Sequence, residues 1–247
     1  GGEAARRRGG EAARRRDNGK PGKSMQRAFQ TLSILLVTTA GGLRAQVEVI
    51  DQGQLVIRIA DAEVAREQFT LTPGRRGGLT GSSLRATASY PGVRPRTQYA
   101  AILERNAAQT LAAFQVERSG DAPERTVAEL SRDRLTVRTA APARESAREY
   151  PGGADLVALD DSVYALWLAV IDLATEEGAP LRVVYPRTGW RGRIVATRTR
   201  IPDAGPSISL SGDIEGRILL DADGRFSQLI LPAKQVEVLR QSESPPS

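Results

Sequence analysis

The chain contains no cysteine and no histidine. Without cysteine there can be no disulfide framework, no thiolate nucleophile and no lipidated cysteine behind a signal peptide. Without histidine the chain lacks the commonest general base, metal ligand and pH switch. Ser-His-Asp hydrolases, zinc enzymes and haem proteins are therefore disfavoured, and we expect no metal and no cofactor. An enzyme is the least favoured class.

The net positive charge of the chain is confined to its first residues. Residues 1–24 hold eight basic and three acidic residues, which is +5 of the total of +6. Residues 46–247 hold 25 basic and 26 acidic residues, a net charge of −1. This part lacks the basic surface that binds nucleic acid, so we expect no nucleic-acid partner. Its preference for Arg over Lys we attribute to genome composition.

Residues 1–24 have a composition typical of disorder, because they offer no apolar face to bury. Residues 1–8 and 9–16 are the same octamer, GGEAARRR, written twice. Blocks of Arg could form a nucleic-acid-binding arm. We favour upstream sequence joined to a true start at Met25, or a cloning remnant.

The segment Met25–Ala45 has the layout of a secretory signal peptide. Arg27 gives the charged first part, Ala28–Ala40 a mostly apolar middle part, and Ala45 the small residue before the cut. The apolar run is too short and too polar for a membrane span of about 20 residues. A buried helix or strand is the alternative. We expect a soluble protein of the periplasm or the extracellular space.

Most of the chain beyond Val47 alternates apolar and polar residues with period two, which is typical of half-buried strands. The clearest run places four apolar side chains on one face: Leu84, Ala86, Ala88 and Tyr90. Leu55, Ile57 and Ile59 also share a face, and Phe69 and Leu71 alternate with polar residues. Further strands are predicted at Thr97–Arg105, Leu111–Arg118, Thr126–Leu130, Arg134–Thr139, Ala143–Tyr150, Leu181–Tyr185, Arg193–Arg200, Ile208–Leu210, Gly216–Leu220, Phe226–Leu231 and Gln235–Arg240. Turns are predicted at Pro73-Gly74, Pro91-Gly92, Ser119–Asp121, Pro151–Gly153 and Asp221–Gly224.

One segment follows a helical period instead. Residues 161–177 place apolar side chains at i, i+3, i+4, i+7 and i+8, starting from Val163 and including Leu166, Trp167, Val170 and Ile171. Asp160 or Asp161 could cap its start, and Gly178 should end it.

These elements predict a mainly β fold, in which a long antiparallel curved sheet, an open or partly closed barrel, wraps one amphipathic helix. The helix is apolar around more than half its circumference, so a flat sheet would leave part of it in water. We expect one β-rich domain at 46–240 and a disordered tail at 241–247.

The run Val157–Pro186, with Leu159-Asp160-Asp161 before the predicted helix, and the hairpin Asp221–Arg225 leading to Pro232 carry a resemblance. Over residues 155–240 the chain resembles bacterial exported proteins of unknown function that are predicted to share the open barrel of the periplasmic lipoprotein carriers. The resemblance implies the fold and no functional residue.

Three groups of residues could form polar sites, and each has a structural interpretation that we favour. Asp221–Gly224 starts like a calcium loop, but Arg225 and Pro232 occupy ligand positions, so a hairpin is favoured. Gly74–Gly78 could cradle an anion but lacks the context of a phosphate loop. The acids Asp155, Asp160, Asp161, Glu176 and Glu177 could serve glycoside hydrolysis, but they flank the helix ends, where capping and solvation explain them.

The function that we predict is non-enzymatic binding, in which a lipid or other apolar ligand lies between sheet and helix. The residues expected to line that site are Leu166, Trp167, Val170, Ile171, Ala86, Ala88 and Trp190. Trp190 lies in a Gly-rich stretch and could instead cover the open end of the sheet. The alternative function is a cell-envelope scaffold or interaction protein with a packed interior and an envelope protein as partner. We expect a monomer.

The first prediction concerns export. The order of charged, apolar and small residues in Met25–Ala45 predicts cleavage after Ala45, so N-terminal sequencing of exported protein should begin at or near Gln46. An intact chain found in the cytosol, still carrying Leu32–Val37, would contradict the prediction.

Overall fold

The computed structural model describes residues 48–76, 79–92, 96–201 and 205–241, with the side chains of residues 75–80 left aside. The described residues belong to one compact unit, Ala45–Ser247. The repeat at 1–16 and the predicted signal peptide lie outside the described residues. In the part of the chain that is described, no helix has the length and apolar character needed to cross a membrane.

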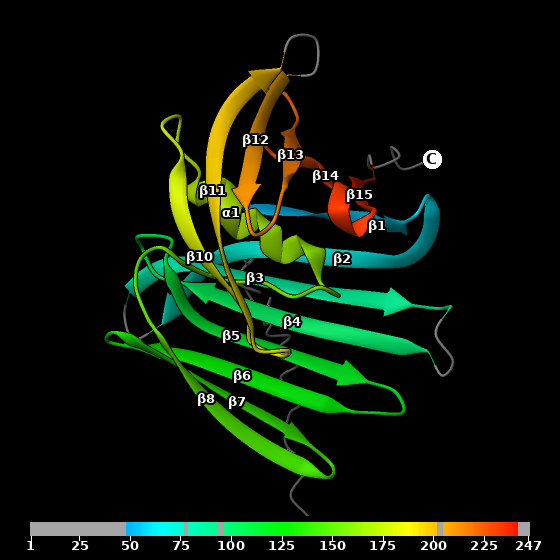
Figure 1. Cartoon of the computed structure of the whole chain (residues 1–247), viewed down its shortest axis with the longest axis vertical. Helices are drawn as coiled ribbons and strands as arrows, with labels where there is room; N and C mark the ends of the chain where they lie inside the picture. The colour runs from blue at the N-terminus through cyan, green and yellow to red at the C-terminus, as the bar shows by residue number, and fades with distance from the viewer. Residues whose placement is uncertain (1–47, 77–78, 93–95, 202–204, 242–247) are drawn as a thin grey trace, which may run out of the picture. The chain divides into compact units, whose positions relative to one another are not determined.

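Fifteen strands of the described ranges form a single sheet (Figure 1). The first half of the chain supplies β1 (Asp51–Ile59), β2 (Ala62–Arg76), β3 (Leu79–Tyr90), β4 (Thr97–Arg105), β5 (Leu111–Ser119), β6 (Glu124–Ser131), β7 (Arg134–Ala141) and β8 (Arg144–Pro151). The second half supplies β9 (Leu156–Ala158), β10 (Ala179–Tyr185), β11 (Trp190–Ile201), β12 (Gly205–Gly212), β13 (Gly216–Leu220), β14 (Phe226–Leu231) and β15 (Val236–Arg240). The predicted mainly β class is therefore confirmed.

The sheet is open, and its strand order runs from β8 down to β1, then β15 down to β9. The first and last of these strands, β1 and β15, pair in the middle, so β8 and β9 form the two edges. All pairs are antiparallel except β9 with β10, which is parallel. The predicted long antiparallel sheet is therefore confirmed, with this one pair as the exception. A parallel pair needs a crossover connection, and the helical segment provides it.

Most predicted strands are confirmed to within a few residues. Gly216–Leu220 and Phe226–Leu231 have the predicted bounds, and Asp221–Gly224 joins them as a hairpin turn. In that turn the Asp221 carboxylate accepts the backbone N–H groups of Asp223 and Arg225, at 3.0 and 2.8 Å. Ile59 does not join Leu55 and Ile57 in the core, because the β1–β2 register shifts after Ile57 and leaves Ile59 exposed.

The turn predicted at Pro73-Gly74 was wrong, because β2 continues through it to Arg76. Gly74 pairs with Gly81 across the β2–β3 ladder. A Cβ at Gly81 would clash with the backbone oxygen of Arg105 on β4. Gly81 is therefore required for the close approach of two strands. The tip of the predicted Gly74–Gly78 anion loop falls outside the described residues.

The helix is shorter than the predicted range 161–177. It consists of a 3₁₀ turn, η1 (Tyr164–Trp167), continued by α1 (Leu168–Leu173). At its start Val163 is extended and forms a bridge with Asp160. At its end Ala174 is extended, and Thr175 forms a parallel bridge with Thr197 of β11.

Contacts with β11 explain why helical structure ends before the predicted Gly178. The Arg198 guanidinium donates hydrogen bonds to the backbone oxygens of Ile171 and Ala174, and the Arg198 N–H donates to the oxygen of Thr175 at 2.7 Å. These carbonyl groups are thereby satisfied from the sheet instead of by another helical turn.

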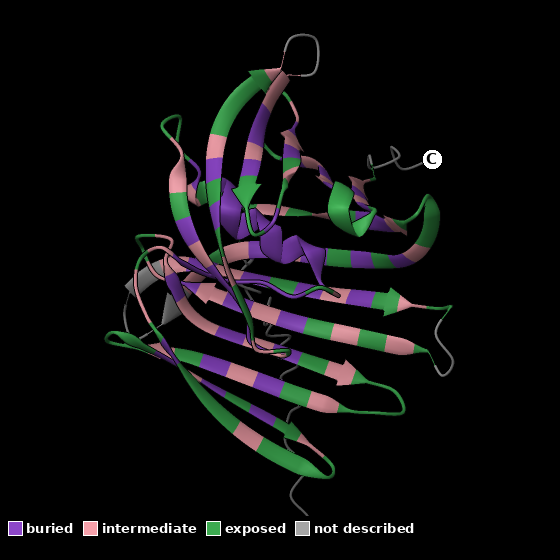
Figure 2. Ribbon diagram, viewed as in Figure 1, coloured by how far each residue is buried: buried purple, intermediate pink, exposed green. Residues whose placement is uncertain are grey.

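The helical segment lies in the core of the fold. All residues from Tyr164 to Ile171 are buried, and they join the inward-facing side chains of the strands in one apolar cluster. Figure 2 shows the segment buried along almost its whole length, whereas the strands alternate between buried and exposed residues. The expected arrangement, a curved sheet around one apolar helix, is the one observed.

The second prediction tests this packing. Leu166 is 0 % exposed, so Leu166→Ala should lower the free energy of unfolding in urea by about 2–5 kcal/mol. Leu173→Ala, a half-buried site on the same helix, is the matched control and should cost clearly less. A loss below about 0.5 kcal/mol for Leu166→Ala would mean that the helical segment is peripheral.

Candidate functional site

Six of the seven predicted ligand-binding residues lie together in the core. Each of them is at most 7 % exposed, and they belong to one cluster: Leu166, Trp167, Val170, Ile171, Ala86 and Ala88. The alanines lie on the inward face of β3. These small residues and the helical segment belong to the same apolar cluster.

A cavity in the described part of the chain touches the helical segment at Ala169 and Leu173 and measures about 10 Å³. It also contacts Leu103, Arg105 and Leu156. A single buried water molecule needs about 10–15 Å³, so this space holds at most one water. It has no room for a lipid chain.

Trp190 lies apart from the other six residues, at the start of β11, and is 37 % exposed. Its ring packs against Tyr185, with the ring centroids 5.0 Å apart. A Cβ at Gly192 would clash with the Trp190 ring, so glycine is needed for the ring to lie over the strand. Lys234 contacts the Tyr185 ring as well, with its Nζ 5.1 Å from the ring centroid.

The principal polar site lies where the helical segment meets the sheet. Glu67 on β2 is 0 % exposed, and its carboxylate accepts the backbone N–H of Tyr164 at 2.8 Å and that of Ala165 at 2.9 Å. The predicted cap from Asp160 or Asp161 was wrong, since no side chain of the segment itself caps η1. The cap comes from a strand 97 residues earlier in the chain.

Burial changes the acidity of this group. Desolvation raises the pKa of Glu67 to about 7, although the hydrogen bonds from Ala165 and Tyr164 favour the ionised form and act in the opposite direction. The nearby charge of Asp160 raises the pKa further. Glu67 therefore changes protonation near neutral pH.

A second buried acid adjoins the first. The side chain of Asp160 is 0 % exposed and forms a two-pronged pair with Arg187, with Nε–Oδ2 at 2.9 Å and Nη2–Oδ1 at 3.0 Å. Arg187 also binds the exposed carboxylate of Asp161. Burial raises the pKa of the Asp160 carboxyl, while the bonds from Arg187 lower it. Burial lowers the pKa of Arg187, but the hydrogen bond and charge of Asp160 and the charge of Asp161 outweigh this and raise it overall.

Two tyrosines complete this group of residues. The Tyr90 hydroxyl donates to the backbone oxygen of Ser162 at 2.9 Å. The Tyr99 ring packs edge-on against Tyr90 at 5.6 Å and lies under the Arg187 guanidinium at 5.2 Å. We call Glu67, Tyr90, Tyr99, Asp160 and Arg187 the junction cluster. Burial raises the pKa of Tyr90, so its hydroxyl stays protonated as a donor.

A further arginine holds the other end of the segment. Arg105 on β4 is 6 % exposed, and its Nη1 lies 2.6 Å from the Asp172 carboxylate of α1. Its Nε donates to the Ser82 hydroxyl at 3.0 Å, and that hydroxyl bonds Gln109 at 2.9 Å. The helical segment is thus tied to the sheet at both ends.

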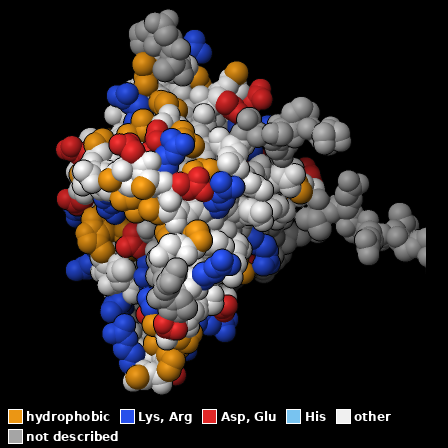
Figure 3. Space-filling model, turned by 90° about the vertical axis from the view of Figure 1, so that its right-hand side faces the viewer, with side chains coloured by type: hydrophobic (Ala, Val, Ile, Leu, Met, Phe, Trp, Pro, Cys, Tyr) orange, Lys and Arg blue, Asp and Glu red, His pale blue; other side chains and the backbone are white. Residues whose placement is uncertain are grey.

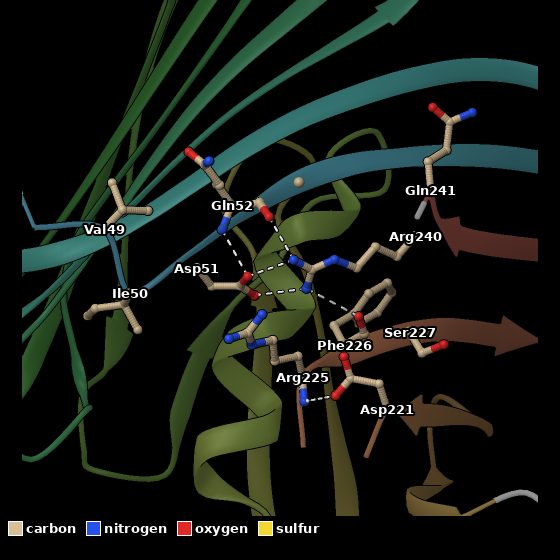
Figure 4. A pocket seen from close by; sticks show the side chains of 11 residues that line it. Val49, Ile50, Asp51, Gln52, Asp221, Arg225, Phe226, Ser227, Arg240 and Gln241 are labelled. Carbon is tan, nitrogen blue, oxygen red and sulfur yellow. Dashed lines mark hydrogen bonds and ion pairs between the residues drawn. The ribbon is translucent and has the colours of Figure 1, made fainter. Parts of the chain in front are cut away.

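An open cavity of about 580 Å³ lies away from the helical segment, at the start of β1 (Figure 4). Arg240 occupies it and pairs with Asp51 at 2.7 and 3.0 Å, while donating to the backbone oxygens of Gln52 and Phe226. The Arg225 side chain projects into the same space. The Arg240 guanidinium is already paired with Asp51 and with backbone oxygens. The cavity is therefore lined by polar groups of both charges, with no cluster of one sign.

The other acids considered from the sequence do not form a reactive pair. Asp155 binds Arg182 at 2.6 Å in a surface ion pair that lowers the Asp155 pKa. Glu176 and Glu177 are exposed. Among the described residues, no three acids lie close enough together to hold a metal ion.

Comparisons with protein-family models, curated proteins and solved structures found no match. The resemblance to exported open-barrel proteins therefore stays a prediction, and so do the export and the binding function.

Glu67 and Arg187 were missed by the sequence analysis. A pattern for Glu67 was present, because extending the alternation of Phe69 and Leu71 back by two residues places Glu67 on the inward face. A charged residue at an inward strand position predicts a buried partner. No local sequence pattern identifies Arg187 as a buried charged residue, since it lies in the short turn between β10 and β11.

The third prediction concerns pH. The Glu67 pKa rises from 4.5 in the unfolded chain to about 7 in the fold, so the folded state holds a proton that the unfolded state releases between these values. The contribution is present at low pH and is lost as pH rises through about 7. The free energy of unfolding should fall by about 2.5 kcal/mol from pH 5 to pH 8.

Glu67→Gln is the variant that checks this origin. Because the chain has no histidine, the slope between pH 5 and pH 8 should largely vanish in the variant, whatever its absolute stability. A ¹³C NMR titration of the Glu67 carboxyl gives an independent value. A carboxyl that titrates near 4.5, with the slope retained in Glu67→Gln, would contradict the assignment.

Proposed function

We propose that this protein is a non-enzymatic scaffold or interaction protein of the cell envelope or extracellular space, whose curved sheet is filled by its own helical segment. The observation that supports the proposal best is the burial of Leu166, Trp167 and Val170, each 0 % exposed. The proposed localisation rests on the signal-peptide pattern of Met25–Ala45.

The polar contacts of the junction cluster support the same proposal. Glu67 is occupied by two backbone N–H groups, Asp160 by Arg187, and the Tyr90 hydroxyl by Ser162. Groups that perform acid–base chemistry must reach a substrate. These groups are directed at the protein itself, so their role is to position the helical segment.

The face of the molecule seen in Figure 3 bears a mixture of charged and apolar side chains. On that face, charged side chains of both signs are interspersed with small hydrophobic areas. Trp190 and Val195, at 37 % and 39 % exposed, are large apolar side chains of β11 that reach the surface. Contacts with a partner protein fit such a mixed surface.

The second candidate is the apolar-ligand carrier. It is favoured by the small inward residues Ala86, Ala88 and Ala101, all at most 4 % exposed. If the helical segment moved away, these residues would leave a wide apolar groove. A ligand would then have to replace the segment and break its bonds to Glu67, Arg105 and Arg187.

The fourth prediction separates the two candidates. Protein from its native host should be free of lipid by native mass spectrometry. In a Trp190→Phe variant, which leaves Trp167 as the only tryptophan, emission should not shift saturably when oleic acid or phosphatidylglycerol vesicles are added. A saturable shift at one lipid per chain would contradict the scaffold proposal and establish the carrier.

A further inference from the structure

The edge strand β8 (Arg144–Pro151) leaves one row of backbone groups without a partner in the described part of the chain. It pairs with β7 on one side and is the last strand of the sheet on the other. All of its residues except Ser146 and Tyr150 are exposed, as Figure 2 shows. The opposite edge differs, because β9 is only three residues long and fully buried.

The direction of these backbone groups follows from the ladder. The Gly152 N–H donates to the Asp133 oxygen at 2.6 Å, and the β7–β8 register has no shift. In an antiparallel strand the N–H and C=O of alternate residues point to the same side. Those of Glu145, Ala147 and Glu149 therefore point away from β7.

The end of this row is already closed by the protein. The Pro151 oxygen would continue the outward row, and it accepts a hydrogen bond from Arg182 Nη1 at 3.0 Å. Pro151 itself has no N–H to donate. Arg182 belongs to β10, so contacts from the other half of the sheet set the limit of the open edge. Three donors and three acceptors remain, from Glu145 to Glu149.

The side chains give the edge a charge pattern. Tyr150 is buried on the face of the sheet that is turned toward the core, so the side chains of Arg144 and Arg148 lie on that face. The side chains of Glu145 and Glu149 lie on the opposite face of the sheet. A groove of about 980 Å³ on β6, β7 and β8 is lined in part by Glu145 and Ala147. It offers space for side chains of an added strand.

A second copy of the chain does not fit this edge. In an antiparallel pair related by a two-fold axis, the residues whose backbone groups point away from β7 must lie opposite one another. Five registers meet this condition. Each register places like charges directly opposite one another. The facing pairs are Glu145 with its own copy, Arg144 with Arg148, Glu145 with Glu149, Arg148 with its own copy, or Glu149 with its own copy. Like charges directly opposite destabilise a pair of strands. The edge thus disfavours self-association.

We propose that β8 is a docking edge for an extended segment of a partner protein that adds antiparallel to the sheet. The segment carries acidic residues opposite Arg144 and Arg148 and basic residues opposite Glu145 and Glu149. Its backbone bonds the outward groups of Glu145, Ala147 and Glu149. This inference rests on the proposed function, since it names the surface through which a scaffold would act.

The probe is a capped peptide with the core Lys-Glu-Val-Thr-Lys-Glu, whose charges match residues Glu149 to Arg144 in antiparallel order. Its control is Glu-Lys-Val-Thr-Glu-Lys, of the same composition with the charges exchanged. In an NMR titration the matched peptide should shift the amide signals of residues 144–149 and slow hydrogen exchange at Ala147, and the control should bind at least about tenfold more weakly.

Two variants test the mode of binding. Ala147→Pro removes one outward donor and leaves the β7–β8 ladder intact, so it should weaken the matched peptide about tenfold or more, whereas Ala147→Thr should not. Glu145→Lys, an exposed site, opposes a lysine of the peptide and should weaken it as well.

Equal binding of both peptides, stronger binding of the control, or binding unaffected by Ala147→Pro and Glu145→Lys would overturn the inference. Absence of binding by lipid-free protein would overturn it as well, while leaving the proposed function standing. Lipid in the interior would refute the proposed function and is measured independently of the edge.

Discussion

The carboxylate of Glu67 is the interaction on which the arrangement of the interior depends. It meets two backbone N–H groups of a helical segment that has no cap of its own and is only ten residues long. A helix this short is not stable alone in water. Its geometry is imposed by the sheet, through Glu67 at the start and Arg198 at the end. Because the segment is also the crossover between the parallel strands β9 and β10, the same contacts fix the last edge of the sheet.

Arginine is the residue that ties distant parts of the chain together. Arg105 reaches α1, Arg187 reaches the loop before η1, and Arg182 reaches the end of β8. A planar guanidinium presents five N–H donors in a fixed fork, so it can form a two-pronged pair with a carboxylate and still donate to backbone oxygens, whereas a lysine ammonium has three donors on a single nitrogen. The abundance of arginine, which the sequence alone suggests to be a matter of genome composition, thus has a structural use at these positions.

The sequence predicted what depends on neighbouring residues and missed what depends on distant ones. The strands Gly216–Leu220 and Phe226–Leu231 follow from period-two alternation, and their turn follows from Asp221 and Gly224. The helical period around Leu166 correctly placed a buried helix. Its ends were placed wrongly, because Asp160 turned out to pair with Arg187, and Thr175 with β11.

The candidate site shows the same division. The apolar residues Leu166, Trp167, Val170 and Ile171 were correctly grouped, but whether they face a ligand or the protein depends on how far the sheet closes around them. No local pattern encodes that. The buried pair formed by Asp160 and Arg187 was beyond reach for the same reason, since both residues look like ordinary surface charges in their own neighbourhoods.

The helical segment should be a permanent part of the core. Native-state hydrogen exchange of the Tyr164 and Ala165 amides, the two groups bound by Glu67, measures this. We expect these amides to exchange only with global unfolding, at the same free energy as the central strands β1 and β15. Exchange through a local opening at least about 2 kcal/mol less costly would show instead that the segment behaves as a lid.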